Sequence, residues 1–429
     1  MTRTIKVDYM ARVEGEASMS MEVEGGQLKA LTLDIYEPPR FFQGFLIGRR
    51  FDEVPDIVAR ICGICPAAHE ITAIQALEDA MGIQVSLQTK DLRRLLALAQ
   101  DIQSHALGIY MLALPDYLGY ESAIAMAADH KEAVQRALRL KKLGNDFTEL
   151  IGGRAVHPVT AVVGGFTRIP ARAQVEEMAR RLEAARDDVM ATVELVSQLS
   201  LPKFKPDDTE FAALRHPTEY AVNEGRLVSS EGLDISPREY RAHIEEKHVP
   251  PSHALFSSIK GRGSFLVGPL ARLNLNLDRL CPAARAALKK VGVTFPNQNT
   301  FASIAARAVE LVQFVEDSLA IIHRYEGRPE AVIHQVRAGT GAALTEAPRG
   351  TLYHSYRVDA HGIVEAADIV SPTAHNAYNM ENDLKAFVPG LLKRPESEIQ
   401  LKCEMMVRNY DPCFSCSAHF LKVNVVRRD

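Results

Sequence analysis

The chain has 429 residues, 47% of them hydrophobic, which is enough to bury a large core. Its net charge is −4, with both signs interspersed, and this excludes a nucleic-acid surface built on excess positive charge. The first residues hold no apolar stretch typical of a signal peptide, and the longest apolar runs are too short to span a bilayer. We therefore expect a cytoplasmic protein that binds neither nucleic acid nor membrane.

The first part of the chain predicts β-strands, and a long helical region follows. Residues 1–36 alternate apolar and polar positions, and Gly25-Gly26 predicts a hairpin turn. Apolar residues then recur with the helical period of 3.6 in three long segments, residues 90–112, 173–199 and 304–325. Helices of this length favour an antiparallel bundle.

The second half of the chain predicts an irregular segment and then more β structure. Residues 200–265 are rich in proline, glycine and charge, which predicts an irregular excursion. Residues 351–370 predict strands joined by a turn at Asp359–Gly362. With β structure near both ends and helices between, we expect a single α+β domain over residues 1–429, mostly a bundle of long helices.

The cysteines indicate metal or redox chemistry. Six in a chain of this length are too few for a disulfide scaffold. Four of them form two CxxC pairs, Cys62 with Cys65 and Cys413 with Cys416, and a histidine follows each pair, His69 and His419. Four thiolates select zinc, an iron–sulfur cluster or another thiophilic metal over hard cations.

A structural zinc knot and a pair of redox disulfides are the alternatives on spacing alone. Zinc staples usually join nearby segments, whereas these two pairs are separated by almost the whole chain. The first pair runs directly into a predicted amphipathic helix, and the two histidines exceed what four-coordinate zinc needs. These features count against zinc.

Six motifs occur in the order ARVEGEA, RICGICPAAH, SHALGIYMLALPDYLGY, EAPRG, SPTAHN and DPCFSCSAH. Together they resemble the large, catalytic subunit of nickel–iron hydrogenases, and the resemblance covers the whole chain. The stretches ARVEGE, PRFF, LPDYLGY and MVRNYDPCFSCSAH most resemble α subunits of cytoplasmic sulfhydrogenases, which are bidirectional enzymes coupled to NAD(P). The resemblance implies that family's fold and reversible heterolytic cleavage of dihydrogen. A deazaflavin-reducing hydrogenase is the alternative within the family.

The resemblance also implies the metal ligands. All four thiolates would hold nickel, with Cys62 and Cys413 as terminal ligands. Cys65 and Cys416 would bridge nickel to an iron that carries carbon monoxide and two cyanides. Soft thiolates suit this role because they stabilise varied nickel oxidation states. The quinone-site subunit of respiratory complex I resembles this family but lacks the four cysteines.

The resemblance further names Glu14 as the proton acceptor beside Cys413. The alternative is a solvated strand glutamate like Glu16, which would share its face of a strand. Arg349 would lie over the metals, with Pro348 beside a diatomic ligand. As an alternative, Arg349 is a loop residue after a proline turn.

Three further residues would support this arrangement. Thr373 would donate a hydrogen bond to a cyanide. Asp411 would orient Arg349, or simply form a turn before Pro412, and Asp116 would play a similar supporting part. We expect His69 and His105 to contact other side chains rather than a metal. Cys281 and Cys403 match no ligand motif and are interpreted as small hydrophobic residues.

The chain departs from the family at Gln43, where many large subunits have a glutamate. In those subunits the glutamate and the C-terminal histidine, here His419, bind magnesium or another hard cation. A glutamine carbonyl can ligate but adds no charge, so we expect a divalent cation near His419 to be held weakly.

The chain shows no GxGxxG after a strand and no ferredoxin-like cysteine run, so partners must supply these functions. The resemblance implies an iron–sulfur small (delta) subunit, further iron–sulfur subunits, and a flavin subunit that carries FAD and binds NAD(P). It also implies nickel-insertion proteins and a protease that cleaves after His419. Phe420–Asp429 would then be a maturation peptide; alternatively, it is an ordinary final strand.

Overall fold

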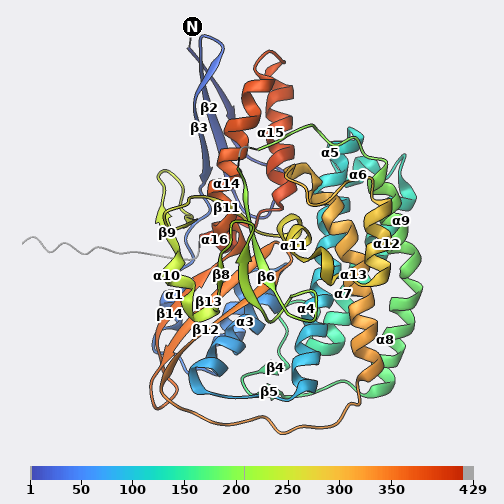
Figure 1. Ribbon diagram of the computed structural model, residues 1–429, viewed down its shortest axis with the longest axis vertical. Helices are drawn as coiled ribbons and strands as arrows, with labels where there is room; N and C mark the ends of the chain where they lie inside the picture. The colour runs from blue at the N-terminus through green and yellow to red at the C-terminus, as the bar shows by residue number, and fades with distance from the viewer. Residues whose placement is uncertain (1, 207, 419–429) are drawn as a thin grey trace, which may run out of the picture.

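The computed structural model describes residues 2–206 and 208–418 and confirms an α+β fold (Figure 1). A bundle of long helices stands beside several small sheets. The helices of eight or more residues are α3 (Pro66–Met81), α4 (Leu87–Leu107), α7 (Lys131–Gly152), α8 (Arg172–Ala184), α9 (Arg186–Ser197), α11 (Pro269–Asn276), α12 (Pro282–Lys290), α13 (Ser303–Arg324), α14 (Pro372–Phe387) and α15 (Glu396–Tyr410).

Shorter helices connect these elements: α1 (Phe42–Leu46), α2 (Val54–Val58), α5 (Leu114–Leu118), α6 (Ala123–Met126), α10 (Tyr240–His243) and α16 (Phe414–Ser417). The predicted helix over residues 90–112 is α4 continued by a π-helical turn, Gly108–Ala113. The predicted helix over residues 173–199 divides at Ala185 into α8 and α9. The predicted helix over residues 304–325 is α13.

The bundle is built around α13, which packs against α4, α8, α9 and α12 (Figure 1). Helix α7 packs along α4 and approaches it closely at Gly144. A Cβ atom there would lie 2.7 Å from the Ala99 carbonyl oxygen and from Gln103. A larger residue at position 144 would therefore separate the two helices.

The N-terminal strands β1 (Thr2–Val7), β2 (Ala17–Glu24) and β3 (Gln27–Ile35) form an antiparallel sheet, as predicted. Gly25 and Gly26 form the β2–β3 turn, both with positive φ. The strand expected through ARVEG is wrong, because β1 ends at Val7. Glu14 instead makes an isolated parallel bridge to Cys413.

The second sheet relevant to the site contains β12 (Gly339–Ala347), β13 (Gly350–Val358) and β14 (Val364–Val370), joined as antiparallel hairpins. The predicted strands and turn over residues 351–370 are confirmed, since Asp359 accepts hydrogen bonds from the His361 and Ile363 amides. Helix α3 packs on β12 and β13, because Gly341 lets the strand approach the Ala80 backbone.

The prediction of an irregular segment over residues 200–265 is wrong. This region contains β6 (Glu210–Arg215), β7 (Arg226–Ser229), β8 (Asp234–Ile235), β9 (Ile244–His248), β10 (Leu255–Ile259) and β11 (Phe265–Leu266). Strands β11, β6, β7 and β8 share one sheet, and β9 pairs with β10; β4 (Ala161–Val162) pairs with β5 (Gly165–Phe166). Such short strands between prolines and glycines leave too little alternation to detect.

Two apolar clusters meet at the C-terminal motif. The larger fills the helical bundle and includes Cys62, Cys65, Cys413 and Cys416. The second lies between the N-terminal sheet, α14 and α15, and includes Phe414. The motif therefore projects its cysteines into one cluster and its phenylalanine into the other. Among the described residues, no helix has both the length and the apolarity needed to cross a membrane.

Candidate metal centre

The first cysteine pair lies where the chain enters α3. A short 3₁₀ turn, Ala59–Ile61, precedes Cys62, and Pro66 occupies the first position of α3. Proline suits this position because its missing N–H would have no helical partner and its φ is already helical. The Ile64 and Cys65 amides each donate to Cys62 Sγ at 3.3 Å. These donors favour a thiolate at Cys62.

The second pair lies immediately after α15. Asp411 ends that helix in the left-handed conformation, with φ 53°, and turns the chain toward the first pair. The Cys413 amide donates to Thr373 Oγ1 at 2.8 Å, so α14 supports the motif from its first turn. The Cys416 amide donates to the Cys413 carbonyl at 3.1 Å.

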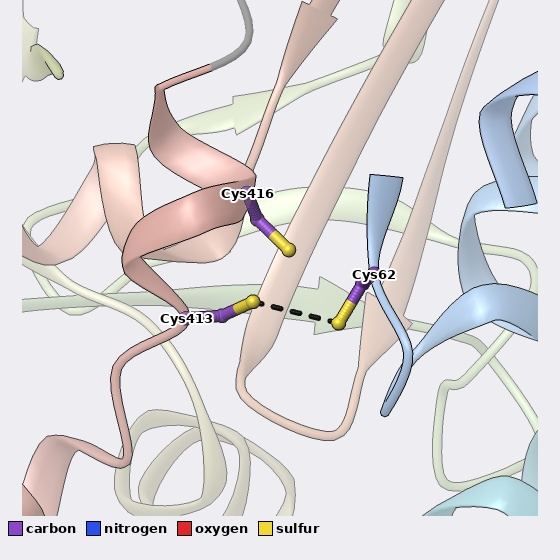
Figure 2. Close-up of side chains that lie close together, drawn as sticks. All are labelled: Cys62, Cys413 and Cys416. Atoms are coloured by element: carbon purple, nitrogen blue, oxygen red, sulfur yellow. Dashed lines mark hydrogen bonds between the residues drawn. The ribbon is translucent and has the colours of Figure 1, made fainter. Parts of the chain in front are cut away.

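The four thiols converge in the interior, and Figure 2 shows three of them, Cys62, Cys413 and Cys416. Cys62 Sγ and Cys413 Sγ lie 3.4 Å apart, and neither bears a disulfide, whose S–S length is about 2 Å. The ligand atoms of Cys62, Cys413 and Cys416 lie within 4.8 Å of one another, and so do those of Cys65, His69 and Cys416. All four cysteines are at most 3% exposed. This buried, sulfur-rich donor set fits a thiophilic transition metal.

The thiols share one electrostatic environment. Contacts with Cys413, Cys416 and Cys65 outweigh burial and hold the pKa of Cys62 well below its usual value. Burial raises the pKa of Cys413 and of Cys416 well above that value, and Cys62 and Cys65 raise both further, although Cys416 lowers that of Cys413. Four thiolates in one buried site therefore require a compensating cation.

Glu14 joins the N-terminal segment to the second pair. Its Oε2 accepts from Cys413 Sγ at 3.0 Å and from the Ser415 amide at 3.2 Å, and the Ser415 hydroxyl donates to Oε1. The Glu14 carbonyl accepts from the Phe414 amide at 2.9 Å. Glu14 is partly exposed, unlike the buried thiols. Glu14 thus links a buried sulfur to a partly exposed part of the chain.

Gly15 allows this close approach. Its φ is +83°, and a Cβ atom would lie 2.8 Å from the Ser415 amide nitrogen and 2.9 Å from Phe414 Cβ. Only glycine meets both demands without displacing the C-terminal motif.

A buried arginine–aspartate pair lies beside the sulfurs. Arg349 Nε donates to Asp411 Oδ1 at 3.0 Å, and both side chains are 3% exposed. Burial disfavours the Arg349 cation, but Asp411 and the nearby cysteine sulfurs outweigh it and raise the pKa of Arg349. Arg307 Nη2 lies 3.7 Å from Asp411 Oδ2, so two guanidinium groups flank one carboxylate. Pro348 immediately precedes Arg349 in the turn between β12 and β13.

Asp116 pairs with arginines other than Arg349. Its carboxylate pairs with Arg12 and with Arg408, whose Nε lies 2.7 Å from Asp116 Oδ2. Arg408 lies in the last turn of α15, so Asp116 anchors the helix that precedes the cysteine motif. It supports the site through α15 rather than by orienting Arg349.

His69 lies beside the sulfurs, whereas His105 lies in a separate buried network. His69 Nδ1 is 3.1 Å from His354 Nε2, and His105 Nε2 is 2.7 Å from Glu310 Oε2. Cys403 is fully buried, as expected for a small hydrophobic residue. Cys281 is only partly buried, and its sulfur accepts from the Ala284 amide at the start of α12.

Gln43 is the described half of the predicted cation site. Its Nε2 donates to the Ile369 carbonyl at 3.1 Å from helix α1. His419 and the predicted maturation peptide, residues 420–429, lie outside the described residues.

Arg40 is a site residue that was not predicted from the sequence. Its Nη2 donates to the Ile61 carbonyl at 2.6 Å and to the Ser415 carbonyl at 2.5 Å, and its amide donates to the Ala418 carbonyl. It therefore ties the two cysteine motifs together. Arg40 stands in PRFF, but nothing in that stretch indicates contacts with residues so distant in sequence.

Comparison with known proteins agrees with this geometry. A model of the family described as nickel-dependent hydrogenase matches residues 40–149 and 262–419, more than half of the chain. The chain is 34% identical to the alpha chain of sulfhydrogenase 1 from Pyrococcus furiosus, with 98% of each chain covered. It is 29% identical to a chain of the F420-non-reducing hydrogenase of Methanothermobacter marburgensis, with 97% of this chain and 94% of the relative covered.

A solved NAD⁺-reducing [NiFe]-hydrogenase in the H₂-reduced state has a similar structure. Its TM-score is 0.86 at 28% identity, with 97% of this chain and 99% of that chain covered. The buried four-cysteine site and these likenesses agree: the chain belongs to the nickel-dependent hydrogenase family, as a large, catalytic subunit.

Proposed function

We propose that this subunit catalyses reversible cleavage of dihydrogen and passes electrons through iron–sulfur and flavin partner subunits to NAD(P) in the cytoplasm. The observation that carries the proposal is the Cys413 thiol donating to Glu14 at 3.0 Å within a buried set of four cysteines. This arrangement pairs metal-binding sulfurs with a proton acceptor, and cleavage of dihydrogen requires both.

In this proposal Cys62, Cys65, Cys413 and Cys416 would together hold the nickel–iron group. When bound, the nickel–iron group supplies redox-active metals, with carbon monoxide and cyanide on iron, at which dihydrogen is cleaved. The fit rests on the convergence of buried sulfurs and on a donor set in which soft ligands predominate. A structural zinc ion is disfavoured, because a structural zinc site needs no carboxyl acceptor aimed at one of its sulfurs.

Glu14 receives the proton from Cys413 Sγ and passes it outward. The 3.0 Å separation is short enough for direct transfer, and the partial exposure of Glu14 gives the proton an exit. The Ser415 amide and hydroxyl hold the carboxylate in this orientation. These contacts distinguish Glu14 from a solvated surface glutamate.

Arg349 and Pro348 would lie on the side of the metal group that carries its anionic ligands, which the Arg349 cation would stabilise. The Arg349 Nη1 group is buried, and no hydrogen bond to it is found among the described residues, so it is available to a ligand. Asp411 orients the guanidinium through its contact with Nε. Thr373 accepts from the Cys413 amide, which leaves its hydroxyl proton for a cyanide. Gln43, with His419, forms a weak site for magnesium or another divalent cation.

Electron transfer requires partners, and the likeness to an NAD⁺-reducing hydrogenase supports NAD(P) as acceptor. The partners are a small (delta) subunit with iron–sulfur clusters, together with iron–sulfur and FAD-containing subunits that bind NAD(P). Nickel-insertion proteins and a protease that removes Phe420–Asp429 complete the active protein, which forms a single domain.

The deciding experiment is dihydrogen oxidation by the complex co-purified from its native source. We expect reduction of NAD⁺ or NADP⁺, near-stoichiometric nickel and iron per large subunit, and infrared bands of carbon monoxide and cyanide. Reduction of a deazaflavin but of neither pyridine nucleotide would contradict the proposed acceptor. Zinc without nickel would contradict the proposed metal group.

A further inference from the structure

The turn that carries Arg349 rests on another buried arginine. Pro348 and Arg349 connect β12 to β13, whose last pair is Ala347 with Gly350. Arg272, in α11, donates from Nη1 to the Ala347 carbonyl at 2.9 Å and from Nη2 to the Pro348 carbonyl at 3.2 Å. One guanidinium group therefore holds the two carbonyls that immediately precede Arg349.

The other side of the turn packs tightly against the segment before α11. Gly268 has φ +111°, and a Cβ atom there would lie 2.8 Å from the Arg349 carbonyl oxygen. A Cβ atom at Gly350 would lie 2.5 Å from Val267 Cγ2 and 2.9 Å from the Gly268 nitrogen. The turn therefore cannot move toward α11, and Arg272 prevents it from moving away.

Arg272 is itself fixed by carboxylates. Its Nε and Nη2 donate to the two Glu310 oxygens at 2.7 Å each, and Nη1 lies 3.2 Å from Glu346 Oε2. Glu310 also accepts from the Tyr220 hydroxyl at 2.6 Å, and His105 Nε2 lies 2.7 Å away. The side chains of Arg272, Glu310 and Glu346 are at most 2% exposed.

Glu310 is ionised at neutral pH, whereas burial raises the pKa of Glu346. Burial opposes ionisation of Glu310, but Arg272 outweighs it and lowers the Glu310 pKa to about 2. Burial lowers the pKa of His105 to about 4, so this histidine is neutral and its Nε2–H donates to Glu310. Arg272 thus keeps a fixed anionic partner, and its planar group can serve the carboxylate and both carbonyls together.

We propose that Arg272 is a positioning residue for the dihydrogen reaction, because it sets the turn that places Arg349 beside the metal group. This inference rests on the role of Arg349 under the proposed function. A lysine at position 272 keeps the charge but cannot make two parallel bonds to Glu310 while reaching both carbonyls. Arg349 would then lose its fixed position, although it does not contact Arg272 itself.

A second buried arginine provides the matched control. Arg93, in α4, makes a bidentate pair with Glu78 at 2.7 and 2.6 Å and is as buried as Arg272. Glu78 lies near the C-terminal end of α3, whereas the cysteines lie before its start. Arg93→Lys therefore breaks a similar ion pair without touching the turn.

The test uses the complete complex and compares Arg272→Lys, Arg93→Lys, Arg349→Lys and the double variant Arg272→Lys/Arg349→Lys. With nickel content unchanged, we expect kcat/KM for dihydrogen to fall about 10²-fold in Arg272→Lys, the usual scale for misplacing a reacting group by about 1 Å. The kcat/KM of Arg93→Lys should stay within a few-fold of the wild-type value, although its Tm should fall about as much as that of Arg272→Lys. In the Arg349→Lys background, Arg272→Lys should cost little more, because both changes remove the same interaction.

A second readout does not depend on turnover. Amide hydrogen exchange should accelerate in peptides spanning residues 346–351 of Arg272→Lys and remain unchanged there in Arg93→Lys. If Arg272→Lys fails to assemble, Glu346→Gln serves instead, with the same faster exchange and a roughly 10-fold loss of kcat/KM.

The outcomes separate this inference from the proposed function. Normal turnover in Arg349→Lys would contradict the proposed role of Arg349. A loss in Arg349→Lys, combined with equal effects of Arg272→Lys and Arg93→Lys, would overturn the positioning role of Arg272. Additive losses in the double variant would overturn it as well.

Discussion

Glu14 and Cys413 are joined twice across a separation of 399 residues: their backbones form a parallel bridge, and the thiol donates to the carboxylate at 3.0 Å. The backbone bridge fixes where the carboxylate lies, so its contact with the sulfur does not depend on a flexible surface side chain. This relationship leads to the first prediction.

Glu14→Gln should keep the shape of the side chain and remove its ability to carry a proton. We expect dihydrogen–deuterium exchange and turnover with an artificial dye to fall by about 10² or more, with nickel content unchanged. Glu16→Gln is the control, because Glu16 is exposed two residues away. Near-normal turnover in Glu14→Gln would show that the proton leaves by another route.

Cys62→Ser and Cys413→Ser should each abolish dihydrogen oxidation. A hydroxyl is a hard, poorly ionised substitute for a thiolate that binds a soft metal. Elemental analysis of the purified protein should show loss of nickel. Cys281→Ser is the control and should retain nickel, because Cys281 caps α12 instead. Wild-type nickel content and turnover in either ligand variant would refute the ligand assignment.

Gly15→Ala should separate the N-terminal segment from the second cysteine pair, because the new Cβ would overlap the Ser415 amide nitrogen. We expect loss of most turnover and a lower nickel content. Gly26→Ala is matched to it: φ is +79°, close to the +83° of Gly15, but nothing lies within 4 Å of the added Cβ. Both variants therefore carry similar backbone strain, but only Gly15→Ala adds a steric clash. Equal losses of turnover and nickel in the two variants would contradict the steric explanation.

Asp383 should make stability fall as pH rises from about 4 to about 6. Burial raises the pKa of its carboxyl to about 6, against hydrogen bonds from Thr300 and Tyr410 that lower it. The folded chain therefore binds this proton more tightly than the unfolded chain, and ionisation costs up to about 3 kcal/mol of stability.

Asp383→Asn removes this titration, so the variant should gain stability relative to wild type across that pH range. Calorimetric Tm values of both proteins, measured in steps from pH 4 to pH 7, would show the difference. A difference in Tm that stays the same at every pH would show that Asp383 does not cause the pH dependence of stability.

The sequence predicted the parts of the site that depend on local spacing. Each CxxC pair can be recognised directly in the sequence, and the 3.6-residue apolar period predicts α13. Arg40 could not be found in this way, because it contacts Ile61 and Ser415 across 21 and 375 residues. Asp116 was expected to play a supporting part, but its partners Arg12 and Arg408 could not be named, because no local pattern relates them to it.

The strands within residues 200–265 show the same limit for the fold. Strands β8 and β11 contain two residues each, too few for a period-two pattern, and β11 pairs in parallel with the distant β6. Tertiary pairing rather than intrinsic preference makes these residues extended.

The two halves of the metal site are separated by 351 residues between Cys62 and Cys413, and this has a consequence for biosynthesis. The ribosome synthesises the first cysteine pair long before the second. Cys62 and Cys65 therefore exist without Cys413 and Cys416 during most of translation. Bringing the pairs together closes a very long loop, and this entropy must be recovered from the packing of the bundle and sheets between them. Contacts between the two pairs therefore require most of the chain to have packed, and we expect all four sulfurs to capture nickel only after that packing.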